Sequence, residues 1–277
     1  MDSIIHFFEQ IPSSQRTIIL VSGFTFFWIL ENSLPLFAFK YNKWQHALLN
    51  IFFTLTTLLV NLGFAFVIIS AADYTSQHQS GLLYLLPLPL WLHVVLGVLL
   101  LDFIGAWLIH WVEHRVPFMW RFHIIHHTDT KVDVTTALRH HPGESVFRAA
   151  FTILAIFVAG VPAGVVMLYQ TLSALFAQLT HANMRVPRKL DKLLSYVLVS
   201  PHMHKIHHHY QLPLTDTNYG NIFSIWDRLF GTYAEAEPQS LVYGLDTHMR
   251  EKEHSRLGSL LLIPFKSPEK NKVTPEG

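Results

Sequence analysis

The sequence predicts an all-α integral membrane protein, and three observations support this prediction. Hydrophobic residues make up 51% of the 277 residues and charged residues only 14%, whereas soluble proteins carry about 25% charged residues. Several apolar stretches reach the length of about 20 residues that a helix needs to cross a hydrocarbon core of about 30 Å. Polar segments separate these stretches, so we expect about four transmembrane segments joined by loops.

The apolar stretches divide the chain into regions, beginning with a short N-terminal segment, residues 1–16. Residues 17–109 contain three predicted transmembrane helices, at 17–39, 47–72 and 82–109. Residues 146–181 form a stretch too long for one crossing, and Gly160, Pro162 and Gly164 interrupt it near the middle. Because glycine and proline end helices, we predict a long helical hairpin here, either transmembrane or re-entrant.

The two remaining regions, residues 110–145 and 182–277, are predicted to form a helical cap. Lysine and arginine occur in the loop after the first apolar segment and in both cap regions, but not in residues 73–81 or at the break at 160–164. The positive-inside rule then places both cap regions on the cytoplasmic face and the N-terminus outside. The polar end of the chain, from Lys266 onward, is expected to be a disordered tail.

Composition excludes several classes of protein. Lys+Arg number 20 and Asp+Glu 19, so there is no basic excess for nucleic-acid binding. The absence of cysteine excludes disulfides, cysteine-ligated zinc sites and cysteine-ligated iron–sulfur clusters. The 19 histidines are an unusually large number, and any metal must therefore be held by nitrogen and oxygen atoms.

Nine of the histidines fall in four groups within or beside the predicted cap. The groups are an HxxxH (His110, His114), an HxxHH (His123, His126, His127), a single His181, and a second HxxHH (His204, His207, His208). Residues at i, i+3 and i+4 share one face of a helix. Nine converging imidazoles exceed the four ligands of one tetrahedral zinc and indicate two metal ions; the simpler alternative is a set of solvated surface histidines.

The other histidines are expected not to bind metal. His202 and His209 flank the second HxxHH but lie off its i, i+3, i+4 face. Six more stand alone in the sequence: His6, His46, His78, His93, His248 and His254.

The order and spacing of the histidine groups resemble the fatty acid hydroxylase superfamily, also called the sterol desaturase family. Other blocks match as well: Asp102 to Arg115 resembles D-x7-H-x3-HR, 122–127 resembles FHxxHH, 139–144 resembles RxHPxE, 181–183 resembles HxN, 200–208 resembles SPxxHxxHH, 216–220 resembles DxNYG, and 226–233 resembles WDRLFGTY. The resemblance covers about residues 100 to 235. The first 90 residues match only as generic membrane anchors.

The resemblance implies an O₂-dependent enzyme with two non-haem iron ions that hydroxylates or desaturates a membrane lipid, of sterol or fatty-acyl type, at an unactivated C–H bond. By this pattern all nine grouped histidines are iron ligands. Some family members have a further histidine where this chain has Ala177, so one iron would carry a water or take another ligand. For His141 a supporting role or a place in the substrate wall is favoured over ligation.

Acidic residues near the histidines are candidates for supporting roles, because ligating histidines usually donate their second N–H to a carboxylate or carbonyl. Asp102 lies eight residues before His110 inside an apolar run, where an ionisable group indicates function; helix capping or packing is its alternative role. The candidate catalytic set is Asp102, Glu113, His141, Asn183 and Asp216. Asp129, Asp133, Glu144 and Asp227 are also near enough in sequence to hold a histidine.

The sequence contains no glycine fingerprint for a flavin or nicotinamide cofactor. We therefore expect an external electron donor: a cytochrome b5-like protein, a ferredoxin-like protein or a reductase. The alternative function is a membrane metal transporter, or a metal-binding protein without oxidative chemistry. A transporter would place its ligands near the bilayer midplane on repeated helices, whereas here they gather at one face and no repeat is visible.

Overall fold

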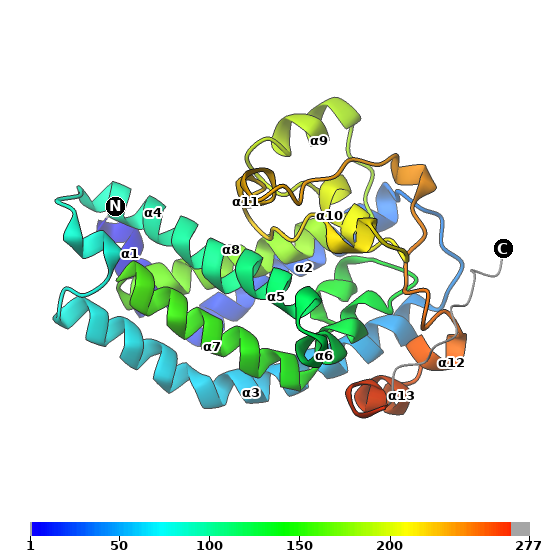
Figure 1. Ribbon diagram of the computed structural model, residues 1–277, viewed down its shortest axis with the longest axis horizontal. Helices are drawn as coiled ribbons and strands as arrows, with labels where there is room; N and C mark the ends of the chain where they lie inside the picture. Colours follow the sequence, from blue (N-terminus) through cyan, green and yellow to red (C-terminus); the bar gives the residue numbers. More distant parts are fainter. Residues whose placement is uncertain (1, 267–277) are drawn as a thin grey trace.

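The computed structural model describes residues 2–266, so the tail expected from Lys266 onward lies outside the described residues except for Lys266 itself. The described part is helical and contains no strand, only three isolated bridges. It has two parts: a bundle of long helices and a set of short helices at one end of that bundle (Figure 1).

Four helical segments of the described chain are long and apolar enough to cross a membrane. The first is α3 (Lys43–Gln77) with the 3₁₀ turn Leu82–Leu85; the second comprises α4 (Leu90–Asp102), a π-helical turn (Phe103–Leu108) and α5 (Ile109–Arg115); the others are α7 (Pro142–Ala159) and α8 (Ala163–His181). The prediction of about four such segments and of a long hairpin is confirmed, but the two arms of the hairpin supply two of the four. The hairpin turns at Gly160, whose φ of 72° lies in the left-handed region that glycine adopts without a steric penalty.

The helix of the first predicted segment differs from the prediction. Residues 17–39 were expected to span, but α2 runs over Ser13–Ser33 and is not among the four segments. Arg16 and Glu31 leave only 14 residues between them, fewer than the about 20 that a crossing needs. A separate helix, α1 (Asp2–Gln10), precedes α2, and the helical conformation is interrupted between them at Pro12.

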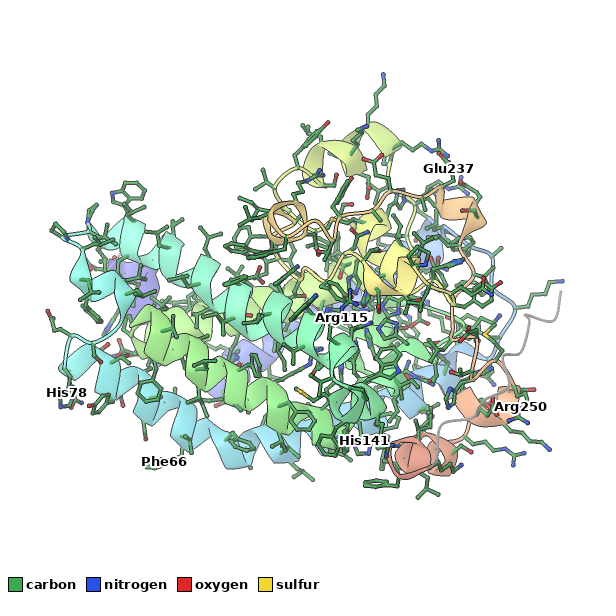
Figure 2. All side chains as sticks on the ribbon, in the orientation of Figure 1. Phe66, His78, Arg115, His141, Glu237 and Arg250 are labelled. Carbon is green, nitrogen blue, oxygen red and sulfur yellow. The ribbon has the colours of Figure 1, made fainter. Side chains whose placement is uncertain are left out.

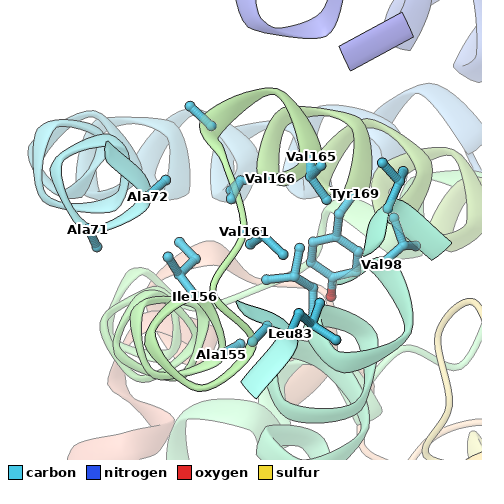
Figure 3. Packing of buried hydrophobic residues seen from close by; sticks show 14 of the residues in the cluster. Ala71, Ala72, Leu83, Val98, Ala155, Ile156, Val161, Val165, Val166 and Tyr169 are labelled. Carbon is cyan, nitrogen blue, oxygen red and sulfur yellow. The ribbon is translucent and has the colours of Figure 1, made fainter. Parts of the chain in front are cut away.

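The helices α4, α7 and α8 pack around one apolar core. Figure 3 shows Val165, Val166 and Tyr169 of α8 close to Ala155 and Ile156 of α7. The outward face of α3 is apolar instead, with exposed Leu55, Leu58, Leu59, Leu62 and Phe66. This face is of the kind that contacts lipid.

Alternate helices run in opposite directions, so the connections gather at two ends (Figure 1). The N-terminus and the turns after α3 and α7 lie at the distal end, and the segments following α5 and α8 lie together at the other end, which we call the cap end. The two regions that the charge pattern assigned to one membrane face therefore do share one end of the bundle.

The cap consists of short helices. They are α6 (Pro117–His127), η3 (Val134–Leu138), α9 (Arg188–Leu194), α10 (Pro201–His207), η4 (Leu214–Asp216), α11 (Ile225–Leu229), η5 (Pro238–Ser240), α12 (Glu251–His254), α13 (Leu257–Leu262) and η6 (Ile263–Phe265). Proline occupies the start of α6 and of α10, where its missing N–H costs no helical hydrogen bond.

Candidate metal centre

The nine grouped histidines meet where the bundle joins the cap. They come from α5, α6, the end of α8, and α10 together with the residue that follows it. One group holds His110, His114, His123, His127 and His207, and the other holds His126, His181, His204 and His208. Figure 2 shows side-chain nitrogens gathered in this region, beside Arg115.

Each HxxHH contributes to both groups. On α6, His123 and His127 belong to the five-histidine group and His126 to the four-histidine group. In the second HxxHH, on α10 and the residue after it, His207 belongs to the five-histidine group, while His204 and His208 belong to the four-histidine group. The two groups adjoin, because the rings of His127 and His208 stack with centroids 5.0 Å apart.

Distances between the ring nitrogens fit metal coordination. In the first group His123 Nε2 lies 3.1 Å from the Nε2 atoms of both His110 and His127. In the second group, His181 Nε2 lies 3.1 Å from the Nε2 atoms of three rings, His126, His204 and His208. Ligands about 2.1 Å from one ion and at right angles to each other would stand about 3.0 Å apart, so these spacings match a shared ion.

The outer nitrogens of five of these rings have acceptors that determine the tautomer. The Nδ1 atoms lie 2.8 Å from Tyr219 O for His110, 2.7 Å from Thr217 O for His207, 2.7 Å from Ala177 O for His181, 3.0 Å from Asp216 Oδ1 for His114, and 3.0 Å from Glu144 Oε1 for His123. A carbonyl or carboxylate oxygen only accepts, so each Nδ1 carries the proton and each Nε2 presents a lone pair.

Lone pairs that face one another without a proton between them are unfavourable unless a cation lies among them. The buried Nε2 of His207 has no hydrogen-bond partner at all, and a buried acceptor left without a partner costs about 1–3 kcal/mol. This donor set therefore fits a metal ion in each group.

Burial also keeps the cap histidines neutral. It lowers the pKa of His123 to about 3, even though Glu144 partly opposes this shift. Burial first, and neighbouring histidines second, lower the pKa of His126, His127, His204, His207 and His208 well below the usual value. Neutral imidazole is the form that binds metal, so these rings are ready for ligation at neutral pH.

Three of the acidic residues near the histidines in sequence lie beside the rings. Asp216 contacts His114, as described above. Glu144 accepts from His123 and also from Arg148, whose Nε lies at 2.7 Å. Glu113 lies 3.7 Å from His123 Nδ1 and 2.7 Å from Arg148 Nη2, so Arg148 bridges the two glutamates.

The remaining members of the candidate catalytic set lie away from the ring nitrogens. Asp102 accepts from the backbone N–H groups of Ile222 and Phe223, at 3.2 Å each, and from Trp226 Nε1 at 3.1 Å. It therefore ties a cap loop to the end of α4. Asn183 likewise exchanges hydrogen bonds with the backbone of Phe37, at 2.8 and 3.0 Å.

His141 is not part of either histidine group. It is the N-cap of α7, where Nδ1 accepts from Gly143 N at 3.0 Å. Its ring packs against Phe122 and Phe265, on the α13 side of the cap (Figure 2).

The neighbouring His140, which the sequence reasoning missed, lies at the site instead. Its ring stacks on His126 with centroids 4.5 Å apart, and its Nδ1 lies 2.9 Å from Glu144 Oε1. With His123 and Glu144 it forms a third set of close metal-binding atoms. No helical spacing signals this contact in the sequence, because His140 precedes His141, the N-cap of α7.

A cavity of about 710 Å³ opens onto both groups from within the bundle. Its lining includes His110, His123, His126, His181 and Ala177, and it continues between α2, α3, α7 and α8. A further histidine at position 177 would project into this space. A larger cavity, of about 1610 Å³ on the cap, contacts none of the nine histidines.

The fold and site define a class: a polytopic membrane protein with two adjoining histidine clusters facing a cavity within the helical bundle. Residues 94–232 match the fatty acid hydroxylase family model. The chain belongs to the fatty acid hydroxylase family, as the histidine spacing predicted.

Curated relatives agree with this assignment. The chain is 32% identical over 146 residues to an ornithine lipid hydroxylase, OlsE, of Rhizobium tropici, covering 52% of this chain and 43% of the relative. It is 33% identical over 163 residues to the alkylglycerol monooxygenase of Homo sapiens (57% and 33%), and 29% identical over 139 residues to a cholesterol 25-hydroxylase-like protein of Danio rerio (49% and 53%). The chain thus spans between about a third and a half of these relatives. No solved structure matches.

Proposed function

We propose that this protein is an O₂-dependent oxidoreductase that oxidises a membrane lipid at an unactivated C–H bond. The observation that carries the proposal is the convergence of nine imidazoles in two adjoining groups at the end of an intramembrane cavity. The histidine ligands are compatible with both hydroxylation and desaturation. The relatives are hydroxylases and monooxygenases by name, which favours hydroxylation.

Two iron ions are the proposed metals. His110, His114, His123, His127 and His207 would hold one ion, and His126, His181, His204 and His208 the other. Imidazole suits iron, copper and zinc alike, but zinc has no redox step. When bound, the iron pair supplies the reaction with O₂ that no side chain provides.

The side chains around the ions have three tasks in this proposal. Glu144, Asp216 and the backbone carbonyls hold the Nδ1 protons of five rings, so that the Nε2 lone pairs of these five rings stay directed inward. The buried imidazole rings exclude water from the space between their Nε2 atoms, where the ions would lie. The cavity beside Ala177 leaves one side of the four-histidine group open toward the lipid, as a catalytic rather than structural site requires.

We also propose that the cap faces the cytoplasm and receives electrons there from a separate protein, such as a cytochrome b5-like protein, a ferredoxin-like protein or a reductase. The positive residues of both cap regions support this orientation. The absence of a flavin or nicotinamide fingerprint supports an external donor.

Oxygen uptake tests the proposal against the metal-transporter alternative. The purified full chain, loaded with iron and supplied with a chemical reductant, should consume O₂ when membrane lipid extract is added. Mass spectrometry of lipids from cells with and without the gene should then show a gain of one oxygen, or a loss of two hydrogens for desaturation. A protein that binds metal but neither consumes O₂ nor alters any lipid would contradict the proposal.

Replacing Glu144 by glutamine should weaken iron binding. Glu144 receives hydrogen bonds from His123, His140 and Arg148, and an amide supplies one acceptor oxygen without the charge. Loss of such a partner weakens metal binding by about 10- to 100-fold, which competition with a chelator would measure. The exposed Glu235→Gln variant should bind iron like the wild type; equal affinities in both variants would remove Glu144 from the proposed support.

A further inference from the structure

The distal part of the 710 Å³ cavity contains a guanidinium group without an acidic partner. Arg16, in the first turn of α2, lines the cavity and donates from Nη2 to Gln170 Oε1 at 3.0 Å and from Nη1 to Met167 Sδ at 3.4 Å. Its Nε is buried and has no hydrogen-bond partner. Two neutral contacts leave donor capacity of this side chain unused.

The cavity offers Arg16 no counter-charge. None of the residues that line it is aspartate or glutamate. The other cation in the lining, Arg148, is neutralised by Glu113 and Glu144, at 2.7 Å each. Arg16 is therefore the one cation of this lining that lacks a carboxylate partner.

Arg16 is half-buried and lies about midway along the bundle axis rather than at either end of it. Gln170, which holds the guanidinium, is eight residues along the chain from the turn residue Pro162 and eleven residues before His181. At 1.5 Å per residue, the guanidinium is about 12 Å from the distal turn and about 16 Å from the histidines. A charge at such depth is costly unless it is paired or lines a functional cavity.

We propose that Arg16 and Gln170 bind the anionic group of a single-chain lipid, a carboxylate or a phosphate. The planar guanidinium forms paired hydrogen bonds with either group, and the adjacent amide of Gln170 adds a donor. The apolar chain then extends along α8 toward His181. A volume of about 710 Å³ is of the size that holds one small ligand.

The identification of this lipid as the substrate rests on the proposed function. The binding of the lipid at Arg16 does not depend on that function. If both hold, the oxidised carbon lies about 16 Å from the anionic group, so oxidation occurs far along the chain from the acid. The Arg16 site would thus determine both which carbon of the chain is oxidised and which head-group charge is bound.

The test compares ligands that share one chain and differ in the head group. Equilibrium binding of hexadecanoate, hexadecyl phosphate and 1-hexadecanol is measured with the full chain in a neutral detergent, with iron bound and O₂ absent. The variants are Arg16→Gln, Arg16→Lys and, as a matched control, the exposed cap arginine change Arg185→Gln. Iron content and gel filtration check that each variant is folded.

Wild-type protein should bind at least one anion about tenfold or more tightly than hexadecanol, the difference that hydrogen bonds to a charged group give. Arg16→Gln should reduce this preference to within about twofold without changing hexadecanol binding, whereas Arg16→Lys should keep part of it and Arg185→Gln all of it. The anion preferred identifies carboxylate or phosphate. Equal binding of all three ligands by the wild type, or an unchanged preference in Arg16→Gln, overturns the proposal. Because O₂ is absent, this result is independent of whether the protein oxidises lipid.

Discussion

Replacing His207 by alanine should abolish lipid oxidation and weaken the binding of the iron ion proposed for the five-histidine group. The buried Nε2 of His207 has no partner in the protein, while its Nδ1 is held by Thr217 O. Its imidazole therefore serves only the first histidine group, and no nearby side chain replaces it. Iron analysis and oxygen uptake on the purified protein measure both effects.

A nearby histidine, His209, provides the control for this experiment. His209 is two residues further along the chain but belongs to neither group; its Nδ1 accepts from Val242 N. His209→Ala should keep both iron ions and most of the activity. A His207→Ala protein with two irons and normal turnover would remove this residue from the proposed ligand set.

Replacing Asp102 by alanine should destabilise the protein strongly, although Asp102 does not touch a histidine. Two backbone N–H groups and the Trp226 indole would lose their acceptor. Each buried donor left unpaired costs about 1–3 kcal/mol, so the loss is about 3 kcal/mol or more. Thermal unfolding in detergent should show a midpoint at least about 6 °C lower.

The destabilisation should also weaken iron binding. The loop that Asp102 anchors is continuous with Tyr219, whose carbonyl oxygen accepts from His110 Nδ1. Asp73→Ala, which removes an exposed acid near the distal end of α3, should leave both the midpoint and the iron content unchanged. If Asp102→Ala unfolds like the wild type, the anchoring role assigned to this carboxylate is wrong.

Much of the site was predictable because its residues are close in sequence. Spacings of three and four put histidines on one side of a short helix, and nine such rings already exceeded the needs of one ion. How they divide between two ions was not predictable. His126 and His127 are neighbours in the chain, but they point to different groups because successive helical residues differ by about 100°.

The residues around 139–144 show the limit of reasoning from a motif. The family block predicted a role for His141, yet this ring caps α7 and packs on Phe122. His140 enters the site because α7 begins directly after His141, which turns the preceding residue toward Glu144 and His126. The direction of a side chain before a helix start depends on backbone angles that the motif does not specify.

By itself, the amino-acid sequence determined the helical membrane fold, the apolar stretches that contain the four long spanning segments, the family and the nine clustered histidines. The fold and the histidine faces follow from composition and from spacing within one helix, where neighbouring residues set the geometry. The family follows from the resemblance of the motif blocks between about residues 100 and 235. Only the tertiary structure decided the two histidine groups, the anchoring role of Asp102 and the facing of Arg16 toward Gln170 on α8. These depend on contacts between segments up to about 150 residues apart, because helix packing, not local periodicity, brings such residues together.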